Sequence, residues 1–198
     1  MSDNSEDNES IGEALPYHLG EYLLANVPGL REYLEEWPEP NMQLDMPCVA
    51  ITLGNPEFRP LAPYYIKPTA DEVAALDAGE TLAVKWVTGI WDFKVSLDIW
   101  AQNKEQRDDM FDSIYNALNP RIDPMGLDLV LPNYFNQLCE LVFVGHTLAD
   151  SQEQAQRDEW RVTLNVLATC KAIRTRQEFI IQTTETQVET FNTVEPIE

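Results

Sequence analysis

The stretch that decides the fold runs from Leu82 to Pro120 and reads LAVKWVTGIWDFKVSLDIWAQNKEQRDDMFDSIYNALNP. Apolar and polar side chains alternate over residues 91–100, the pattern of a strand with one buried and one wet face. Residues 82–87 alternate in the same way, and Thr88-Gly89 separates the two runs. Because glycine readily adopts the positive φ of a tight turn, the pattern predicts a β-hairpin over about 82–100.

The residues that follow predict an amphipathic helix over about 104–118. Asn103 can cap its N-terminus, with Gln106 three residues later as in a capping box. Apolar residues then recur at helical spacing until Pro120 stops the pattern: Met110, Phe111, Ile114, Tyr115 and Leu118. This helix is the nearest cover for one face of the hairpin. We therefore expect an α+β fold with a mostly antiparallel sheet, in which the hairpin packs against the helix.

The flanking sequence predicts the rest of this domain. A helical pattern over 13–36 is interrupted at Pro28-Gly29, which indicates two short helices or one broken helix. Residues 54–68 hold four prolines and predict a long loop or an extended segment at a sheet edge. Strand patterns occupy 46–53, 127–131, 138–148 and 160–173, and the last two favour a long hairpin.

The 198 residues predict a single α+β domain over 13–175 with an arm at each end. The N-terminal arm, 1–12, and the C-terminal arm, 176–198, are both rich in acids. Residues 1–15 and 177–198 each contain five acidic residues and no Lys or Arg. Such composition predicts a disordered N-terminal arm and a C-terminal arm that is flexible or ordered by a partner.

The net charge of −21 argues against a general nucleic-acid binder, which must neutralise phosphates. It favours solubility, basic partners or a surface that repels DNA. No apolar run approaches the length of a membrane span, and the N-terminus lacks the pattern of a secretory signal. Cys48, Cys139 and Cys170 form no close pair and are odd in number, which predicts buried reduced thiols in a cytosolic protein.

The sequence contains no recognisable catalytic motif, so we expect no enzyme and no catalytic, metal or cofactor residues. His18 and His146 are isolated from other ligand-type residues, which favours structural or surface roles. Asp92 and Asp98 lie six residues apart on one strand, about 20 Å, which is too far for an acid–base pair. A pocket of perturbed carboxylates, invisible to motif searches, is the third and least favoured alternative.

Five of the thirteen bases fall within twenty residues around the last predicted strand: Arg157, Arg161, Lys171, Arg174 and Arg176. One interpretation is a solvated strand end that balances nearby acids. The other is a docking patch for the acidic arm of a neighbouring copy. The apolar residues Phe179, Ile180 and Ile181 follow and have no obvious core face, which favours pairing with a neighbouring subunit. These eight residues form the candidate subunit interface.

The order of motifs over roughly residues 80–175 resembles the neck and tail-terminator proteins of tailed bacteriophages, which complete the tail and join it to the head. The resemblance is carried by Leu-Asp-Ile-Trp-Ala (97–101), Asn-Lys-Glu-Gln-Arg-Asp-Asp-Met (103–110), Asn-Pro (119–120), Gly-Leu-Asp-Leu (126–129) and Arg-Asp-Glu-Trp-Arg (157–161).

This resemblance implies a small α+β domain that assembles into a ring at the head–tail junction. A hexameric ring is favoured, with a dodecamer as the alternative. The ring would cap the tail tube or contact the sheath, and join it to the head connector. It implies a structural virion protein made in the host cytoplasm, with no cofactor and no membrane partner. DNA would pass through its channel without sequence-specific binding, and an acidic wall would keep DNA from sticking.

An alternative of a different class is an acidic protein-binding module, such as a DNA mimic that blocks a basic host protein. The charge of −21 motivates it. A mimic usually spreads its acids over the folded surface, whereas ten of the 34 acids here lie in the two ends. This distribution favours the structural virion protein.

Overall fold

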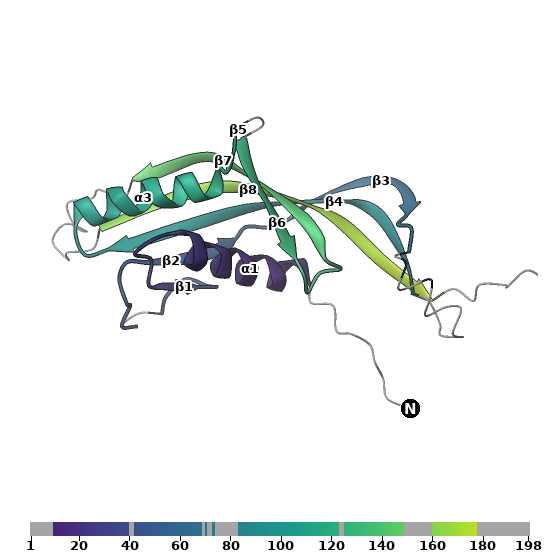
Figure 1. Cartoon of the computed structure of the whole chain (residues 1–198), viewed down its shortest axis with the longest axis horizontal. Helices are drawn as coiled ribbons and strands as arrows, with labels where there is room; N and C mark the ends of the chain where they lie inside the picture. The colour runs from purple at the N-terminus through teal and green to yellow at the C-terminus, as the bar shows by residue number, and fades with distance from the viewer. Residues whose placement is uncertain are drawn as a thin grey trace, which may run out of the picture.

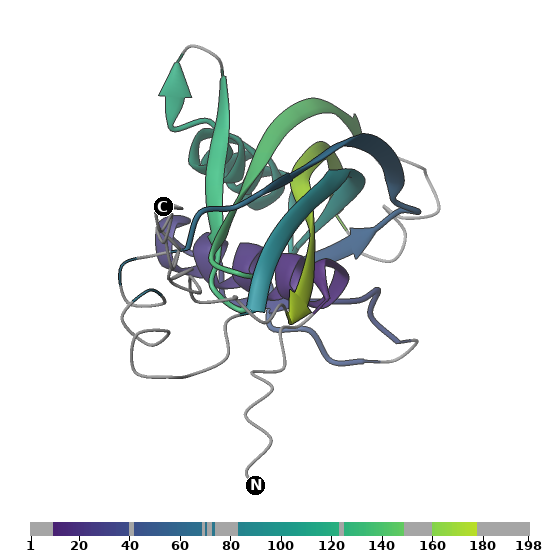
Figure 2. The ribbon, with the colours of Figure 1, turned by 90° about the vertical axis from the view of Figure 1, so that its right-hand side faces the viewer.

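The computed structural model describes residues 10–39, 42–68, 70, 73, 83–122, 125–148 and 160–177. It has an α+β fold in which a curled, mostly antiparallel sheet packs against two helices (Figure 1). Figure 2, turned by 90°, shows how strongly the strands curve. The predicted arm segments 1–9 and 178–198 lie outside the described residues. No helix among the described residues is long and apolar enough to cross a membrane.

The strand order in the sheet is β1-β2-β4-β8-β7-β6-β5, and β3 also pairs with β4. All pairs are antiparallel except β1 with β2. The elements in chain order are α1 (Ile11–Asn26), β1 (Glu32–Leu34), β2 (Cys48–Leu53), β3 (Glu57–Tyr65), β4 (Ala83–Ala101), α3 (Lys104–Leu118), β5 (Arg121–Ile122), β6 (Met125–Leu131), β7 (Gln137–Leu148) and β8 (Trp160–Gln177).

The core lies between one face of the sheet and both helices. Alternation along β4 and β8 brings apolar residues into register, as in the pairs Leu97–Leu164 and Ile99–Val162. These side chains join α1 and α3 in one buried cluster. The predicted helix over 104–118 is confirmed: Asn103 caps it by accepting a hydrogen bond from the backbone N–H of Gln106. Helix α3 packs on β4, β7 and β8.

The predicted hairpin over 82–100 is wrong, because β4 continues through Thr88-Gly89 as one strand of 19 residues. Both of its halves pair with β8 in the same direction, from Ala83–Gln177 to Ala101–Trp160. The register shifts between Val87 and Gly89, so Thr88 is the extra residue of a β-bulge. Gly89 serves close packing here, because an added Cβ would lie 2.4 Å from the ring of Phe58 and 2.6 Å from the carbonyl oxygen of Arg59.

The N-terminal prediction needs two corrections. A single helix, α1, begins at Ile11, so two residues of the predicted arm 1–12 belong to it. A second helix does not form after Pro28-Gly29; residues 32–34 instead make β1, which pairs in parallel with β2. Gly29 has a φ of 87°, and the chain turns there toward the sheet. The predicted strands near 46–53, 127–131, 138–148 and 160–173 are confirmed as β2, β6, β7 and β8.

The prediction of three reduced thiols is also wrong for two of them. Cys139 and Cys170 form a disulfide between β7 and β8. They lie directly opposite each other in the strand register, with Cα atoms 4.7 Å apart. Cys48 is free and buried, and burial raises the pKa of its thiol to about 12. The odd count leaves room for one disulfide and one free thiol.

Candidate interaction surface

A three-stranded arm extends beyond the helices at the right of Figure 1. It consists of β3, residues 83–92 of β4 and residues 169–177 of β8. Strands β2 and β3 share one edge of β4: β2 pairs with its residues 95–100 and β3 with its residues 86–92. Between them, the backbone N–H of Gly54 donates to the carbonyl oxygen of Lys94 at 2.7 Å. The proline-rich segment predicted as a loop or edge segment is therefore an edge strand.

The arm exposes aromatic side chains along its edge. Every residue of β3 is exposed, and Phe58, Tyr64 and Tyr65 each keep more than 40% of their surface accessible. Two of them pair across the seam with β4, where Phe58 lies 4.7 Å from Trp91 and Tyr65 lies 6.2 Å from Trp86 between ring centroids. These cross-strand pairs hold β3 against β4. They also leave an apolar surface facing water.

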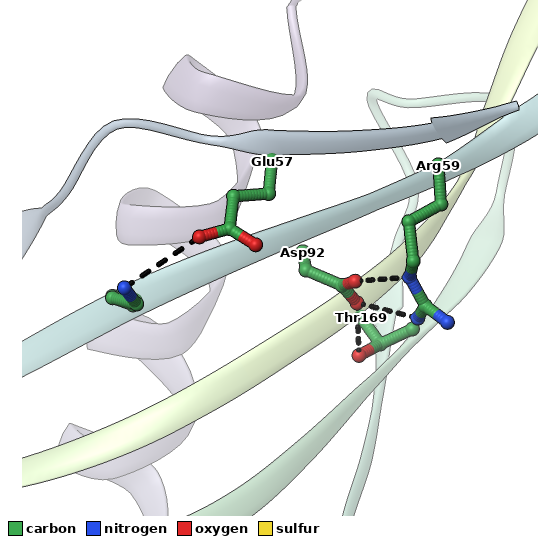
Figure 3. Close-up of polar contacts among 5 residues, drawn as sticks. Glu57, Arg59, Asp92 and Thr169 are labelled. Carbon is green, nitrogen blue, oxygen red and sulfur yellow. Dashed lines mark hydrogen bonds and ion pairs between the residues drawn. The ribbon is translucent and has the colours of Figure 1, made fainter.

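A polar network ties the base of the arm together (Figure 3). The guanidinium of Arg59 on β3 donates two hydrogen bonds to the carboxylate of Asp92 on β4, and Thr169 on β8 donates a third at 2.9 Å. The hydrogen bonds from Arg59 hold the pKa of Asp92 below its usual value, and Asp92 raises the pKa of Arg59 in turn. Beside them, Lys94 and Glu57 form an ion pair at 3.6 Å.

The arm is positively charged, although the chain is strongly acidic. Its three segments contain five bases and two acids, which gives a formal charge of +3 in a chain of −21. Both acids, Glu57 and Asp92, already form ion pairs. Lys171 and Arg174 are exposed, and within the described ranges neither side chain forms an ion pair. The unpaired charge of the arm is therefore positive.

The structure separates the bases that the sequence groups together. Arg161 lies ten residues before Lys171 on the same strand, a distance of about 33 Å, so the two cannot share a patch. Lys171 and Arg174 both lie on the arm, where they pair in register with Ile90 and Trp86 of β4. Arg176 is in β8, but its side chain is not described. Arg157, Phe179, Ile180 and Ile181 lie outside the described residues.

Arg161 belongs to a packed cluster at the opposite end of β8. Its guanidinium carbon lies 4.9 Å from the ring centroid of Trp37 and 5.4 Å from that of Trp100. The carboxylate of Asp98 lies 3.8 Å from Arg161 Nε and accepts a hydrogen bond from Thr163. The Asp98 side chain is only 5% exposed, so Arg161 balances a buried charge. This geometry is typical of a residue that stabilises the fold.

The sequence analysis predicted the β3 segment as a loop or an edge segment but did not include it in the candidate interface. Its aromatic residues and Arg59 lie among prolines, and nothing local shows that this segment pairs with residues 21 to 35 positions later in the chain. The signal available in the sequence was the set of three aromatic residues, Phe58, Tyr64 and Tyr65, within a proline-rich segment. Across the part of the chain that is described, no group of three or more His, Cys, Asp or Glu residues could hold a metal ion.

Comparison with known proteins gives no relative from which a function could be carried over: no protein-family model matches the chain, and no curated protein matches it.

Proposed function

We propose that this protein is a structural virion protein of a tailed bacteriophage that forms a ring at the head–tail junction. In this role it caps the tail tube, contacts the head connector and leaves a central channel for DNA. The motif order over residues 80–175 supports the proposal by its resemblance to neck and tail-terminator proteins. The α+β fold is compatible with the domain that such a resemblance implies.

The observation that carries the proposal is the arm. A monomeric protein gains little from a projecting edge strand with every residue exposed, because the strand adds exposed aromatics and a backbone edge that pairs with no other described strand. In an assembly the same features become contact area. Aromatic residues and arginine are enriched in protein interfaces, and the arm exposes both.

A ring made from one chain needs two different patches on each subunit, because each copy contacts its two neighbours through a head-to-tail interface. The outer face of the sheet offers a second patch. Val130 pairs with Leu138, and Val142 pairs with Leu167, and all four side chains are exposed on the face away from the helices. The arm and this outer patch differ in shape and chemistry, which suits a closed ring.

Negative-stain imaging of the purified full chain, alone and mixed with phage tail tubes, tests the proposal. We expect rings with a central opening, seated on one end of the tubes in the mixture. Particles of monomer size in both samples would overturn the proposal. Tight, salt-sensitive binding to a basic host protein, with no rings, would support the acidic protein-binding module instead.

A further inference from the structure

The unpaired cations of the arm identify the chemistry of their partner. We propose that Lys171 and Arg174 of one copy bind the acidic segment 178–198 of a neighbouring copy. The inference deepens the proposed function and rests on it, because the ring supplies the neighbour. It assigns the C-terminal segment as the occupant of the arm surface.

Charge complementarity favours this occupant. Segment 178–198 contains Glu178, Glu185, Glu189, Glu195 and Glu198 and no Lys or Arg. The two acids of the arm are held by Arg59 and Lys94, so an incoming carboxylate meets exposed cations without a competing acid beside them. Electrostatic attraction of this kind speeds association and fixes register.

The segment and the arm also match in their apolar residues. Exposed ion pairs alone contribute little, so a stable contact also needs apolar burial. Segment 178–198 begins with Glu178 followed by Phe179, Ile180 and Ile181. On the arm, Arg174 pairs in register with Trp86, which contacts the exposed ring of Tyr65. Arg174 therefore lies beside aromatic rings on one face of the arm, and Lys171, three residues earlier in the strand, lies on the other face.

The position of the segment favours contact between copies over a return onto its own arm. Strand β8 ends at Gln177, at the tip of the arm, so the segment begins where the arm ends. A return would need a tight turn, yet residues 172–191 contain no Gly, Pro, Asn, Asp or Ser. Its 21 residues can reach about 70 Å when extended, which is enough to cross to the next subunit of a ring.

Two charge-reversal variants of the full chain test the contact between copies. K171E/R174E makes the arm acidic, and E178K/E185K/E189K makes the segment basic, because it changes the formal charge of the segment from −5 to +1. In sedimentation velocity, we expect each variant alone to need a roughly tenfold higher concentration than wild type for half-assembly, because like charges now meet. An equimolar mixture should recover wild-type assembly, since each arm then meets an oppositely charged segment on the other variant.

R31E/K104E is the control for net charge, because it makes the same change as K171E/R174E at exposed bases away from the arm; Arg31 differs from the arm bases in that it pairs with Asp45 at 3.0 Å. It should assemble like wild type. Thermal melting of every variant establishes that each one folds. If assembly recovers only when all five substitutions are in one chain, and not in the mixture, the segment folds onto its own arm and the inference is overturned.

The remaining outcomes separate the inference from the proposed function. If wild type and K171E/R174E assemble equally well, the inference is wrong, but the proposal that the protein forms a ring is unaffected. If wild type is monomeric alone but forms rings on tail tubes, the inference that free copies bind one another through the arm and the segment is wrong, and the proposed function is supported. Only a wild type that stays monomeric in both settings overturns both.

Discussion

At the scale of single residues, the disulfide has the clearest consequence. It closes a loop over a sequence separation of 31 between two central strands. In the chain-entropy description, such a link stabilises the folded state by roughly 2–4 kcal/mol. We therefore expect reductant to lower the free energy of unfolding by about this amount in urea titrations. A C139A/C170A variant, which has no link to reduce, should not respond to reductant.

The same pair makes a prediction about thiol content. Denatured protein without reductant should show one free thiol per chain, that of Cys48, in a colorimetric thiol assay. Three free thiols per chain would contradict the disulfide. The sequence could not supply this pair, because only the non-local register of β7 on β8 places Cys139 opposite Cys170.

The ion pair of Arg59 and Asp92 predicts a dependence of stability on pH. The pKa of Asp92 is lower in the folded state than in the unfolded chain, so the pair stabilises the protein above the unfolded value of about 4. This stability is lost as the pH falls through the folded pKa. R59Q should therefore lower Tm at pH 7 and match wild type at strongly acidic pH.

Differential scanning calorimetry across this pH range checks the prediction. K104Q removes a charge from an exposed lysine on α3, far from Asp92, and should show no such convergence with wild type. A Tm difference between R59Q and wild type that stays constant down to the lowest pH would show that Asp92 does not stabilise the arm through this pair.

At the scale of elements, Gly89 decides how β3 joins the sheet. An added Cβ would meet both the Phe58 ring and the β3 backbone at less than 3 Å, so the edge strand would have to move. We expect G89A to destabilise the protein by about 1–3 kcal/mol in urea unfolding. G145A is the control, because no atom lies within 4 Å of a Cβ added at Gly145, and it should change stability by less than about 0.5 kcal/mol.

Elements fixed by local signals were predictable, and those fixed by distant pairing were not. Helix α3 follows from its cap at Asn103 and its apolar spacing, both within the segment itself. Thr88-Gly89 has the composition of a turn, but the pairing of β4 with β8 keeps the chain extended through it, with a bulge at Thr88. Tyr33 and Leu34 fit a helical pattern, yet the parallel pairing with β2 makes them a strand.

At the scale of the whole molecule, the two signs of charge are segregated. The arm has a formal charge of +3, whereas the chain carries −21. The sequence located the basic residues around the last strand, but only the long pairing of β4 with β8 shows that Arg161 lies far from Lys171 and Arg174. Positive arms and acidic surroundings on every copy favour contacts between copies, because each arm finds opposite charge on its neighbour.

The central claim is that this arm is a surface for self-assembly, and the mass of the full chain in solution tests it most directly. Light scattering on the eluting peak of a size-exclusion column gives that mass without a shape assumption. Our account predicts a species at a multiple of 22.6 kDa at high protein concentration, which K171E/R174E shifts toward the monomer. A single species of 22.6 kDa for wild type at every concentration would contradict it.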